Sequence, residues 1–155
     1  MKTGFIAITG ATSGIGHAIA RTFIQKGYRV LLLGRRIDRL TSLASDDVLI
    51  RQVAATDRVA LDAALADATE AFGPVEAIIN NAGRMLLGQI ETQDAEEWEE
   101  MFDVNALGVL HGMQAVLPSM VERKTGRSSI SVRLRVKRRS QTMPRTSVRN
   151  SPSTR

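Results

Sequence analysis

Hydrophobic residues in the first 126 positions form short continuous runs that alternate with amphipathic stretches. The runs predict buried strands over 5–8, 28–33, 48–53 and 75–79. Apolar residues at three- and four-residue spacing predict helices over 15–26, 36–44, 56–72 and about 94–121. Strands that alternate with helices are typical of a parallel sheet with helices on both faces. The pattern therefore predicts an α/β fold of three layers, α/β/α, truncated after four or five strands.

The third predicted helix allows two more detailed expectations. Thr56 has the side chain of an N-cap and is expected to begin this helix. Gly73 and Pro74 follow Phe72 and are expected to end it. Its apolar stripe is expected to contain Val59, Ala60, Ala63, Ala64, Ala68 and Ala71.

A glycine-rich turn, T-G-A-T-S-G-I-G over 9–16, follows the first predicted strand directly. Gly10 allows a sharp turn, Gly14 lets a phosphate approach the backbone, and Gly16 lets the next helix lie close to the sheet. The N-terminus of that helix attracts an anion through its partial positive charge. Such a glycine triplet can also be a simple loop, but the flanking strand and helix favour the phosphate-binding turn of a doubly wound Rossmann-type sheet.

The second predicted strand ends at Gly34-Arg35-Arg36. At this corner of a dinucleotide-binding sheet, a carboxylate would bind the ribose 2′-OH of NAD, whereas arginines would pair with the 2′-phosphate of NADP. Arg35 and Arg36 therefore favour NADP(H) over NAD(H). The alternative is two solvated arginines at the start of a helix, where two cations oppose the helix dipole unless an anion offsets them.

The fourth predicted strand is followed by Asn80-Asn81-Ala82-Gly83. Ligands of open α/β sheets bind outside the carboxyl ends of the strands. Ala82 and Gly83 permit close backbone approach, and the amides can either bind a cofactor or tie neighbouring strands together. For Asn80, the strand-holding role carries at least equal weight.

Asn105 lies among Val104, Ala106 and Leu107 in the last predicted helix, so its side chain is expected to be buried. A buried amide needs hydrogen-bond partners. Asn105 is therefore either a core residue bonded to a backbone carbonyl or a site residue at a kink opened by Gly108. His111 has no partner motif and is expected to have a packing or surface role.

Composition limits the class of protein. The chain has 155 residues, 43% of them hydrophobic and 24% charged, which suits one globular domain. It contains no cysteine, which excludes disulfides and thiol chemistry. No metal site is predicted. No apolar run approaches the ~20 residues of a membrane span, and no leader precedes the first strand, so the expected compartment is the cytoplasm.

Charge divides the chain into two parts. Residues 127–155 contain nine basic and no acidic residues, so the remainder carries twelve basic and sixteen acidic residues, a net of −4. We therefore expect an incomplete nucleotide-binding domain over 1–126 and a basic tail over 127–155 that is disordered or strand-like. A strand is predicted over about 129–137, where apolar and polar residues alternate.

Three motifs occur together in one order: T-G-x-x-x-G-I-G at 9–16, N-N-A-G at 80–83, and N-x-x-G at 105–108. With these motifs, residues 1–126 resemble the short-chain dehydrogenase/reductase (SDR) family. The resemblance implies an NAD(P)(H)-dependent oxidoreductase that acts on a small-molecule alcohol or carbonyl. It implies neither a membrane nor a specific nucleic-acid partner, and the oligomeric state is not carried over.

The resemblance also implies roles for individual residues. Asn105 matches the asparagine of the family's catalytic tetrad, which holds a water in a proton relay. Ala54 departs from the pattern, because many members carry an Asp there that binds the adenine. The residues implied to bind the cofactor are Gly10, Thr12, Ser13, Gly14, Ile15, Gly16, Arg35, Arg36, Asn81, Ala82 and Gly83.

The catalytic Ser and the Tyr-x-x-x-Lys of the family are missing from the expected positions. Tyr28 is the only tyrosine of the chain and belongs to the second predicted strand. The chain is therefore predicted to lack turnover. The alternatives are a non-catalytic nucleotide-binding remnant or pseudo-enzyme, and a protein that binds nucleic acid through its basic tail. The last is disfavoured because no recognition module accompanies the charge.

A frameshift near Gly126 offers one explanation of the tail. With free choice of synonymous codons, the shifted frame can encode a Tyr over Thr146, a Lys over Asn150 and a Ser over Arg133, at the family's spacing. Under this hypothesis the tail is an unselected sequence. Sequencing the locus tests it, since the hypothesis requires such an open frame downstream.

Overall fold

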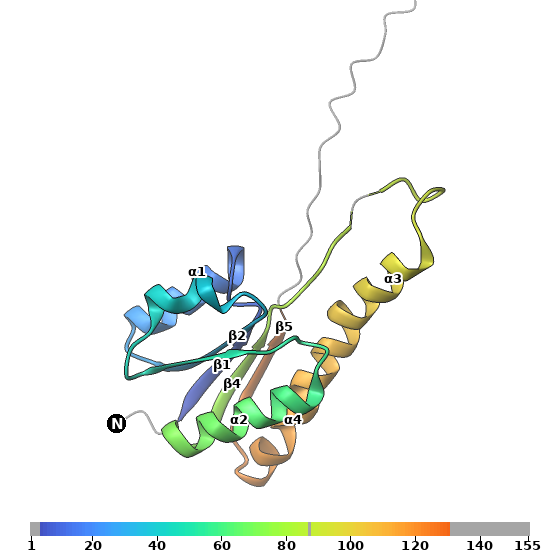
Figure 1. Ribbon diagram of the computed structural model, residues 1–155. Helices are drawn as coiled ribbons and strands as arrows, with labels where there is room; N and C mark the ends of the chain where they lie inside the picture. The colour runs from blue at the N-terminus through green and yellow to red at the C-terminus, as the bar shows by residue number, and fades with distance from the viewer. Residues whose placement is uncertain (1–3, 87, 131–155) are drawn as a thin grey trace, which may run out of the picture.

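A parallel five-stranded sheet forms the centre of the protein (Figure 1). The computed structural model describes residues 4–86 and 88–130. The strand order is β3-β2-β1-β4-β5, with a crossover that sends β4 to the other side of β1, so the sheet is doubly wound. The strands are β1 Phe5–Thr9, β2 Arg29–Gly34, β3 Val48–Gln52, β4 Val75–Asn80 and β5 Arg127–Ile130.

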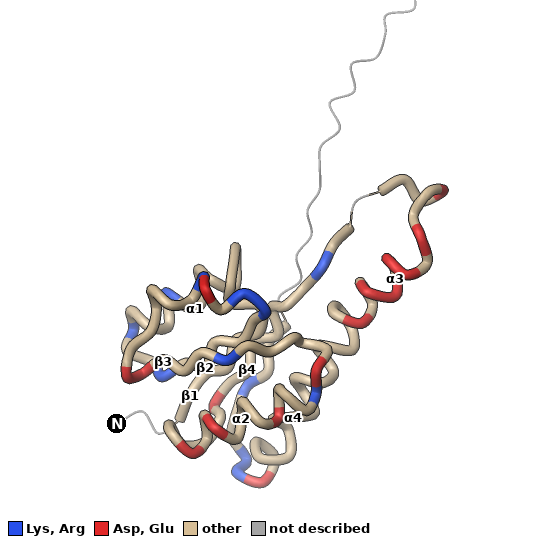
Figure 2. The backbone as a smooth tube through the Cα atoms, viewed as in Figure 1, with Lys and Arg blue, Asp and Glu red and all other residues tan. Residues whose placement is uncertain are grey.

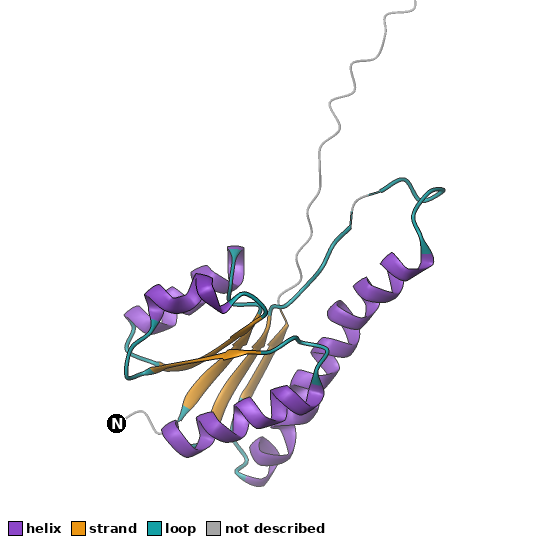
Figure 3. Cartoon of the chain, in the orientation of Figure 1, coloured by secondary structure: helices purple, strands orange, loops and turns teal. Residues whose placement is uncertain are grey.

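Helices cover both faces of this sheet (Figure 3). One face packs against α1 and the 3₁₀ helix η1, and the other packs against α2 and α4. The helical elements are α1 Gly14–Gln25, η1 Ile37–Leu43, α2 Arg58–Phe72, α3 Ala95–Phe102, the π-helical segment η2 Asp103–Leu107, and α4 Gly108–Glu122. The predicted three-layer Rossmann-type architecture is confirmed.

Strand β2 shows how the sheet is buried on both faces. Successive side chains of a strand point to opposite faces. Accordingly, Leu31 and Leu33 belong to the core beneath α2 and α4, whereas Val30 and Leu32 belong to the core beneath α1. All four are at most 1% exposed. The continuous apolar runs thus form strands because helices cover both sides.

The structure corrects the predicted N-cap of α2 and part of its predicted apolar stripe. Its N-cap is Asp57, not Thr56, and the Asp57 carboxylate accepts a hydrogen bond from the Ala60 N–H at 3.0 Å. Val59 is 80% exposed, and Ala63 and Ala71 are also exposed. Ala64 and Ala68 of the predicted stripe are buried, and Ala60 packs partly buried against the same core. The buried face also contains Leu61, Leu65 and Phe72. The larger leucines and Phe72 fill the space above the sheet, so the helix turns them inward.

The helix after β4 is continuous from Ala95 to Glu122 and is long and apolar enough, by length and composition alone, to cross a membrane. One such helix is weak grounds for a membrane assignment. Its α4 part packs on α2 and β4, and its buried residues are Gly108, Gly112, Val116 and Met120. This buried face packs on the sheet, whereas Phe102, Leu107, Leu110, Leu117 and Val121 of the same helix are exposed.

The fifth strand begins earlier than predicted. β5 starts at Arg127 and pairs in parallel with β4, with Ser129 opposite Ile79. The sheet therefore includes the first residues of the basic segment. The rest of the strand predicted over 129–137, and the tail beyond it, lie outside the described residues.

Candidate functional site

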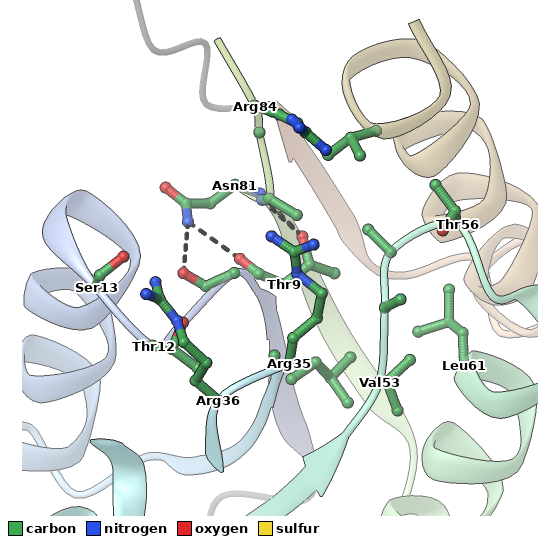
Figure 4. A pocket seen from close by; sticks show the side chains of 18 residues that line it. Thr9, Thr12, Ser13, Arg35, Arg36, Val53, Thr56, Leu61, Asn81 and Arg84 are labelled. Carbon is green, nitrogen blue, oxygen red and sulfur yellow. Dashed lines mark hydrogen bonds between the residues drawn. The ribbon is translucent and has the colours of Figure 1, made fainter. Parts of the chain in front are cut away.

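A pocket opens at the carboxyl ends of the parallel strands (Figure 4). It lies where β1 and β4 diverge to helices on opposite faces, which is the position that ligands of doubly wound sheets occupy. The glycine turn, the end of β2, the segment after β3 and the segment after β4 each contribute to its wall. Its lining includes Arg35, Arg36 and Arg84, and no lining residue is acidic.

The glycine turn is packed tightly at the base of this pocket. Gly10 has φ +67° and Gly14 has φ +56°, in the left-handed region that favours glycine. A Cβ on Gly10 would lie 2.7 Å from the Ala82 Cα, and a Cβ on Gly16 would overlap the Asn81 side chain. The turn can thus approach β4 only with glycine at these positions.

The residues of the turn differ in their access to the pocket. Thr12 and Ser13 line it, together with Gly10. Gly16 is buried beneath the turn, whereas Gly14 and Ile15 are exposed at the start of α1 and are not lining residues. Ser13 is the N-cap of α1 and its hydroxyl makes no capping hydrogen bond. Together with a first turn that lacks acidic residues, this N-terminus suits an anion.

Asn81 ties the glycine turn to β4. Its side-chain Nδ2 donates to the carbonyl oxygens of Thr9 and Gly10, both at 3.1 Å. The Thr9 hydroxyl in turn accepts from the backbone N–H groups of Asn81, at 3.1 Å, and Ala82, at 3.0 Å. Of the two roles considered for the amides, Asn81 therefore has the strand-tying one, and its backbone still borders the pocket with Ala82 and Gly83.

Asn80 does not hold the strand ends. Its side chain is 2% exposed and points toward α4, where a Cβ on Gly112 would overlap its Oδ1. Neither its Oδ1 nor its Nδ2 has a hydrogen-bond partner among the described residues. Of the two roles left open for Asn80, strand tying has no hydrogen bond to support it among the described residues, and the neighbouring Asn81 makes those bonds.

Arg35 and Arg36 stand at the end of β2, and their side chains reach into the pocket (Figure 4). Both are exposed. Among the described residues, neither guanidinium forms an ion pair with an acidic side chain. Gln52 of β3 donates to the Arg35 carbonyl oxygen at 3.1 Å and so fixes the backbone from which the two side chains extend.

Asn105 is exposed, which corrects the expectation of a buried amide. It lies in η2, and its Oδ1 accepts from the Arg84 N–H at 2.8 Å while its Nδ2 donates to the Arg84 carbonyl oxygen at 2.7 Å. Asn105 therefore satisfies both backbone groups of one residue in the loop after β4. A π-helical segment, η2, directly precedes Gly108.

Sequence reasoning overlooked Thr9, Gln52 and Arg84. Thr9 is 3% exposed at the end of β1. A hydroxyl at the end of a strand predicted to be buried was a signal for a structural hydrogen bond, because buried polar groups are hydrogen-bonded. Arg84 directly follows the segment 80–83 at the end of β4, and this position in the sequence was a signal that its charged side chain lines the pocket. Its ion pair with Glu100 of α3 joins residues 16 positions apart and could not be anticipated from spacing.

The chemistry of the pocket lining suits a ligand that carries phosphate groups and a planar base. The glycine turn and the α1 N-terminus present backbone N–H groups to an anion, and the two unpaired arginines add positive charge at one end. Val53, Ala54 and Leu61 form an apolar wall beside them that suits a planar base. Ala54 offers no polar side-chain group there.

Comparisons with known proteins agree with this geometry. The family model described as short chain dehydrogenase matches residues 4–131. An uncharacterized oxidoreductase of Staphylococcus aureus (strain N315) is 39% identical over 123 residues, which is 77% of this chain and 53% of that protein. The NADP-dependent 3-hydroxy acid dehydrogenase YdfG of Salmonella typhi is 37% identical over 125 residues, 78% of this chain and 50% of that protein.

Solved structures share the fold. The closed form of a serine dehydrogenase complexed with NADP⁺ superposes with a TM-score of 0.76 at 37% identity, and the match covers 81% of this chain and 53% of that one. The chain thus spans about half the length of the curated relatives it matches.

Proposed function

Because the chain belongs to the short-chain dehydrogenase/reductase family, we propose that its domain binds NADP(H) in the pocket at the carboxyl ends of the strands. By its family, the protein would be a cytoplasmic oxidoreductase that acts on a small-molecule alcohol or carbonyl. Neither a membrane nor a specific nucleic acid is part of this proposal. The observation that carries it is the convergence on one pocket of the glycine turn, the α1 N-terminus and two arginines that have no acidic partner in the described part of the chain.

Different residues of the pocket would bind different parts of the cofactor. Gly10, Thr12 and Ser13, which line the pocket, would hold the pyrophosphate together with Gly14 and Ile15 at the N-terminus of α1. Gly16 would act from beneath the turn, by letting α1 lie close to the sheet. Arg35 and Arg36 would bind the 2′-phosphate, with charge-assisted hydrogen bonds of the kind that guanidinium groups form with phosphate. Asn81, Ala82 and Gly83 would lie beside the nicotinamide half, because they form the other side of the pocket.

The preference for NADP(H) over NAD(H) has two supports. Arg35 and Arg36 have no acidic partner among the described residues, so their charge is available for a phosphate. One relative is named as NADP-dependent, and one similar structure is complexed with NADP⁺.

The bound cofactor would exchange a hydride with the substrate, and the protein must then move a proton. Asn105 matches the tetrad asparagine, but its side chain is occupied by both backbone groups of Arg84. The only tyrosine, Tyr28, precedes β2, packs edge-on against Phe23 at 5.3 Å between ring centroids and does not line the pocket. We therefore propose that the 155-residue chain binds cofactor without turnover, as a nucleotide-binding remnant or pseudo-enzyme would.

Two measurements test the proposal: a titration of NADPH with the protein, and an assay of NADPH oxidation. Intrinsic NADPH fluorescence should change on addition of the 155-residue chain and give a saturable curve, and NADH should bind more weakly. No oxidation of NADPH is expected with a panel of aldehydes and ketones. Absence of saturable NADPH binding would overturn the cofactor assignment, and steady turnover would overturn the assignment as a non-catalytic chain.

The basic tail is the alternative source of nucleotide affinity. Removal of residues 131–155 leaves every described residue in place, so a pocket-bound cofactor should keep its affinity. A tail-driven interaction would vanish with the tail and would weaken strongly as salt is raised.

A further inference from the structure

Positive charge is distributed unevenly along the pocket. Figure 4 shows Arg84 at the upper end, above Asn81, whereas Arg35 and Arg36 extend from the lower side. Arg84 forms an ion pair with Glu100 of α3. No acidic side chain among the described residues pairs with Arg35 or Arg36. The end at Arg35 and Arg36 therefore keeps its positive charge, and the end at Arg84 is neutralised.

The position of Arg84 is fixed from both sides. Asn105 binds its backbone N–H and carbonyl oxygen, at 2.8 and 2.7 Å. Two residues further on, the Leu86 N–H donates to the Met101 Sδ at 3.4 Å. The loop after β4 is thus docked on α3 and η2, and the guanidinium is held where the Glu100 carboxylate meets it.

The ion pair changes local charge more than it changes stability. The Arg84 and Glu100 side chains are 36% and 54% exposed. Pairs as solvated as this one contribute about 0–1 kcal/mol to folding. A unit charge beside a bound ligand still alters the affinity of a charged ligand group, because Coulomb energies act over several ångströms. The consequence of this pair therefore concerns which ligand charge the pocket accepts.

We propose that Glu100, acting through Arg84, sets the preference of the pocket between oxidised and reduced cofactor. The inference rests on the proposed function: with the 2′-phosphate at Arg35 and Arg36 and the pyrophosphate at the glycine turn, the end beside Arg84 is left for nicotinamide. The oxidised ring carries one positive charge and the reduced ring carries none. An unpaired Arg84 would repel the oxidised ring selectively, and Glu100 cancels this repulsion.

Glu100 is singled out by geometry among several acids. Figure 2 shows acidic residues along α3, and these include Glu96, Glu97 and Glu99. Within the described part of the chain, Glu100 is the acid that pairs with Arg84. Glu99 is its exposed neighbour on the same helix and forms no ion pair within that part. Glu99→Gln therefore removes the same charge without touching the pair and is the matched control.

Equilibrium titrations of the 155-residue chain test the inference. The dissociation constants of NADP⁺, by calorimetry, and of NADPH, by fluorescence, are measured for the wild type and four variants. Glu100→Gln should raise the ratio Kd(NADP⁺)/Kd(NADPH) about two- to threefold at low salt. Arg84→Gln leaves Glu100 unpaired and should lower the ratio by a similar factor. The double variant and Glu99→Gln should keep the wild-type ratio.

The ratio separates charge from structure. If the pair only stabilised the loop, the dissociation constants of NADP⁺ and NADPH would change by the same factor in each variant. The ratio would then stay constant in both Glu100→Gln and Arg84→Gln, and this result would overturn the inference. Because the two variants shift the ratio in opposite directions, either one decides the question if the other fails to fold. A wild type that does not bind NADPH overturns the proposed function, whereas a constant ratio in a chain that binds NADPH overturns only this inference.

Discussion

Asn81 and Thr9 are joined by two hydrogen bonds, both donated by Asn81. The Asn81 Nδ2 donates to the Thr9 carbonyl oxygen at 3.1 Å, and the Asn81 backbone N–H donates to the Thr9 hydroxyl at 3.1 Å. These bonds connect the ends of β1 and β4, and both residues line the pocket. The width of the proposed cofactor site between the glycine turn and the segment after β4 therefore depends on this pair.

The Thr9 hydroxyl is expected to be essential for this connection. Thr9→Val removes the acceptor of two part-buried N–H groups, those of Asn81 and Ala82, while keeping the side-chain volume. We expect a loss of about 1–3 kcal/mol in the free energy of unfolding, measured by urea denaturation. Thr9→Ser keeps the hydroxyl and should lose less. Equal stability of the Val and Ser variants would contradict the role of the hydroxyl.

Gly10 is expected to tolerate no side chain. Its φ is +67°, and an added Cβ would lie 2.7 Å from the Ala82 Cα and 2.9 Å from the Ala82 nitrogen, both backbone atoms. Gly10→Ala should destabilise the domain by about 1–3 kcal/mol and weaken NADPH binding. Gly88→Ala is the control, because its neighbours are side-chain atoms at 3.7 Å or more, and its melting temperature should stay within about 2 °C of the wild type. A wild-type melting temperature for Gly10→Ala would show that the turn can relax.

Arg35 and Arg36 are expected to decide between the two dinucleotides. Charge-assisted hydrogen bonds contribute about 1.5–3 kcal/mol, so the double change Arg35→Gln/Arg36→Gln should weaken NADPH binding about tenfold or more. NADH lacks the 2′-phosphate, and its affinity should change less than about twofold. Arg39→Gln removes a nearby exposed charge that does not line the pocket and should affect neither. Fluorescence titration checks all three, and equal losses for NADPH and NADH would refute 2′-phosphate recognition.

Asn105 is expected to hold the loop after β4. Asn105→Ala removes both partners of the Arg84 backbone, and the Arg84 amide should then exchange its hydrogen faster, by tenfold or more if about 1.4 kcal/mol of protection is lost. Asn105→Asp keeps the acceptor for that N–H and should preserve most of the protection. Hydrogen exchange followed by NMR distinguishes the two. Unchanged exchange in the Ala variant would mean that other contacts hold the loop.

The pattern of hydrophobic residues predicted the strands closely where helices cover both faces of the sheet. The first four strands lie within one residue of the predicted ranges at each end, because continuous apolar runs such as Val30 to Leu33 suit only a strand covered on both faces. The pattern was less informative for α2, where alanines occur on every side of the helix. There, the tertiary structure decided that Leu61 and Phe72 face the core and Val59 faces solvent.

The glycine turn and the segment after β4 show the same division at the site. Their composition was enough to place a ligand pocket at the strand ends, since glycines that permit close approach are read directly from the sequence. It was not enough to assign each amide: Asn80 and Asn81 are adjacent and chemically identical, yet only Asn81 reaches the glycine turn. Successive side chains of a strand point to opposite faces, so position along the pleat separated their roles.

The sequence by itself determined the order of elements, the parallel sheet and the corner that suits a phosphate, because each of these follows from local periodicity and local backbone freedom. Only the tertiary structure decided which charges remain available. Arg84 and Glu100 are separated along the chain and meet through the docking of a loop on α3, whereas Arg35 and Arg36 meet no acid in the described part of the chain. Charge pairing depends on distances between elements, and no spacing in the sequence encodes them.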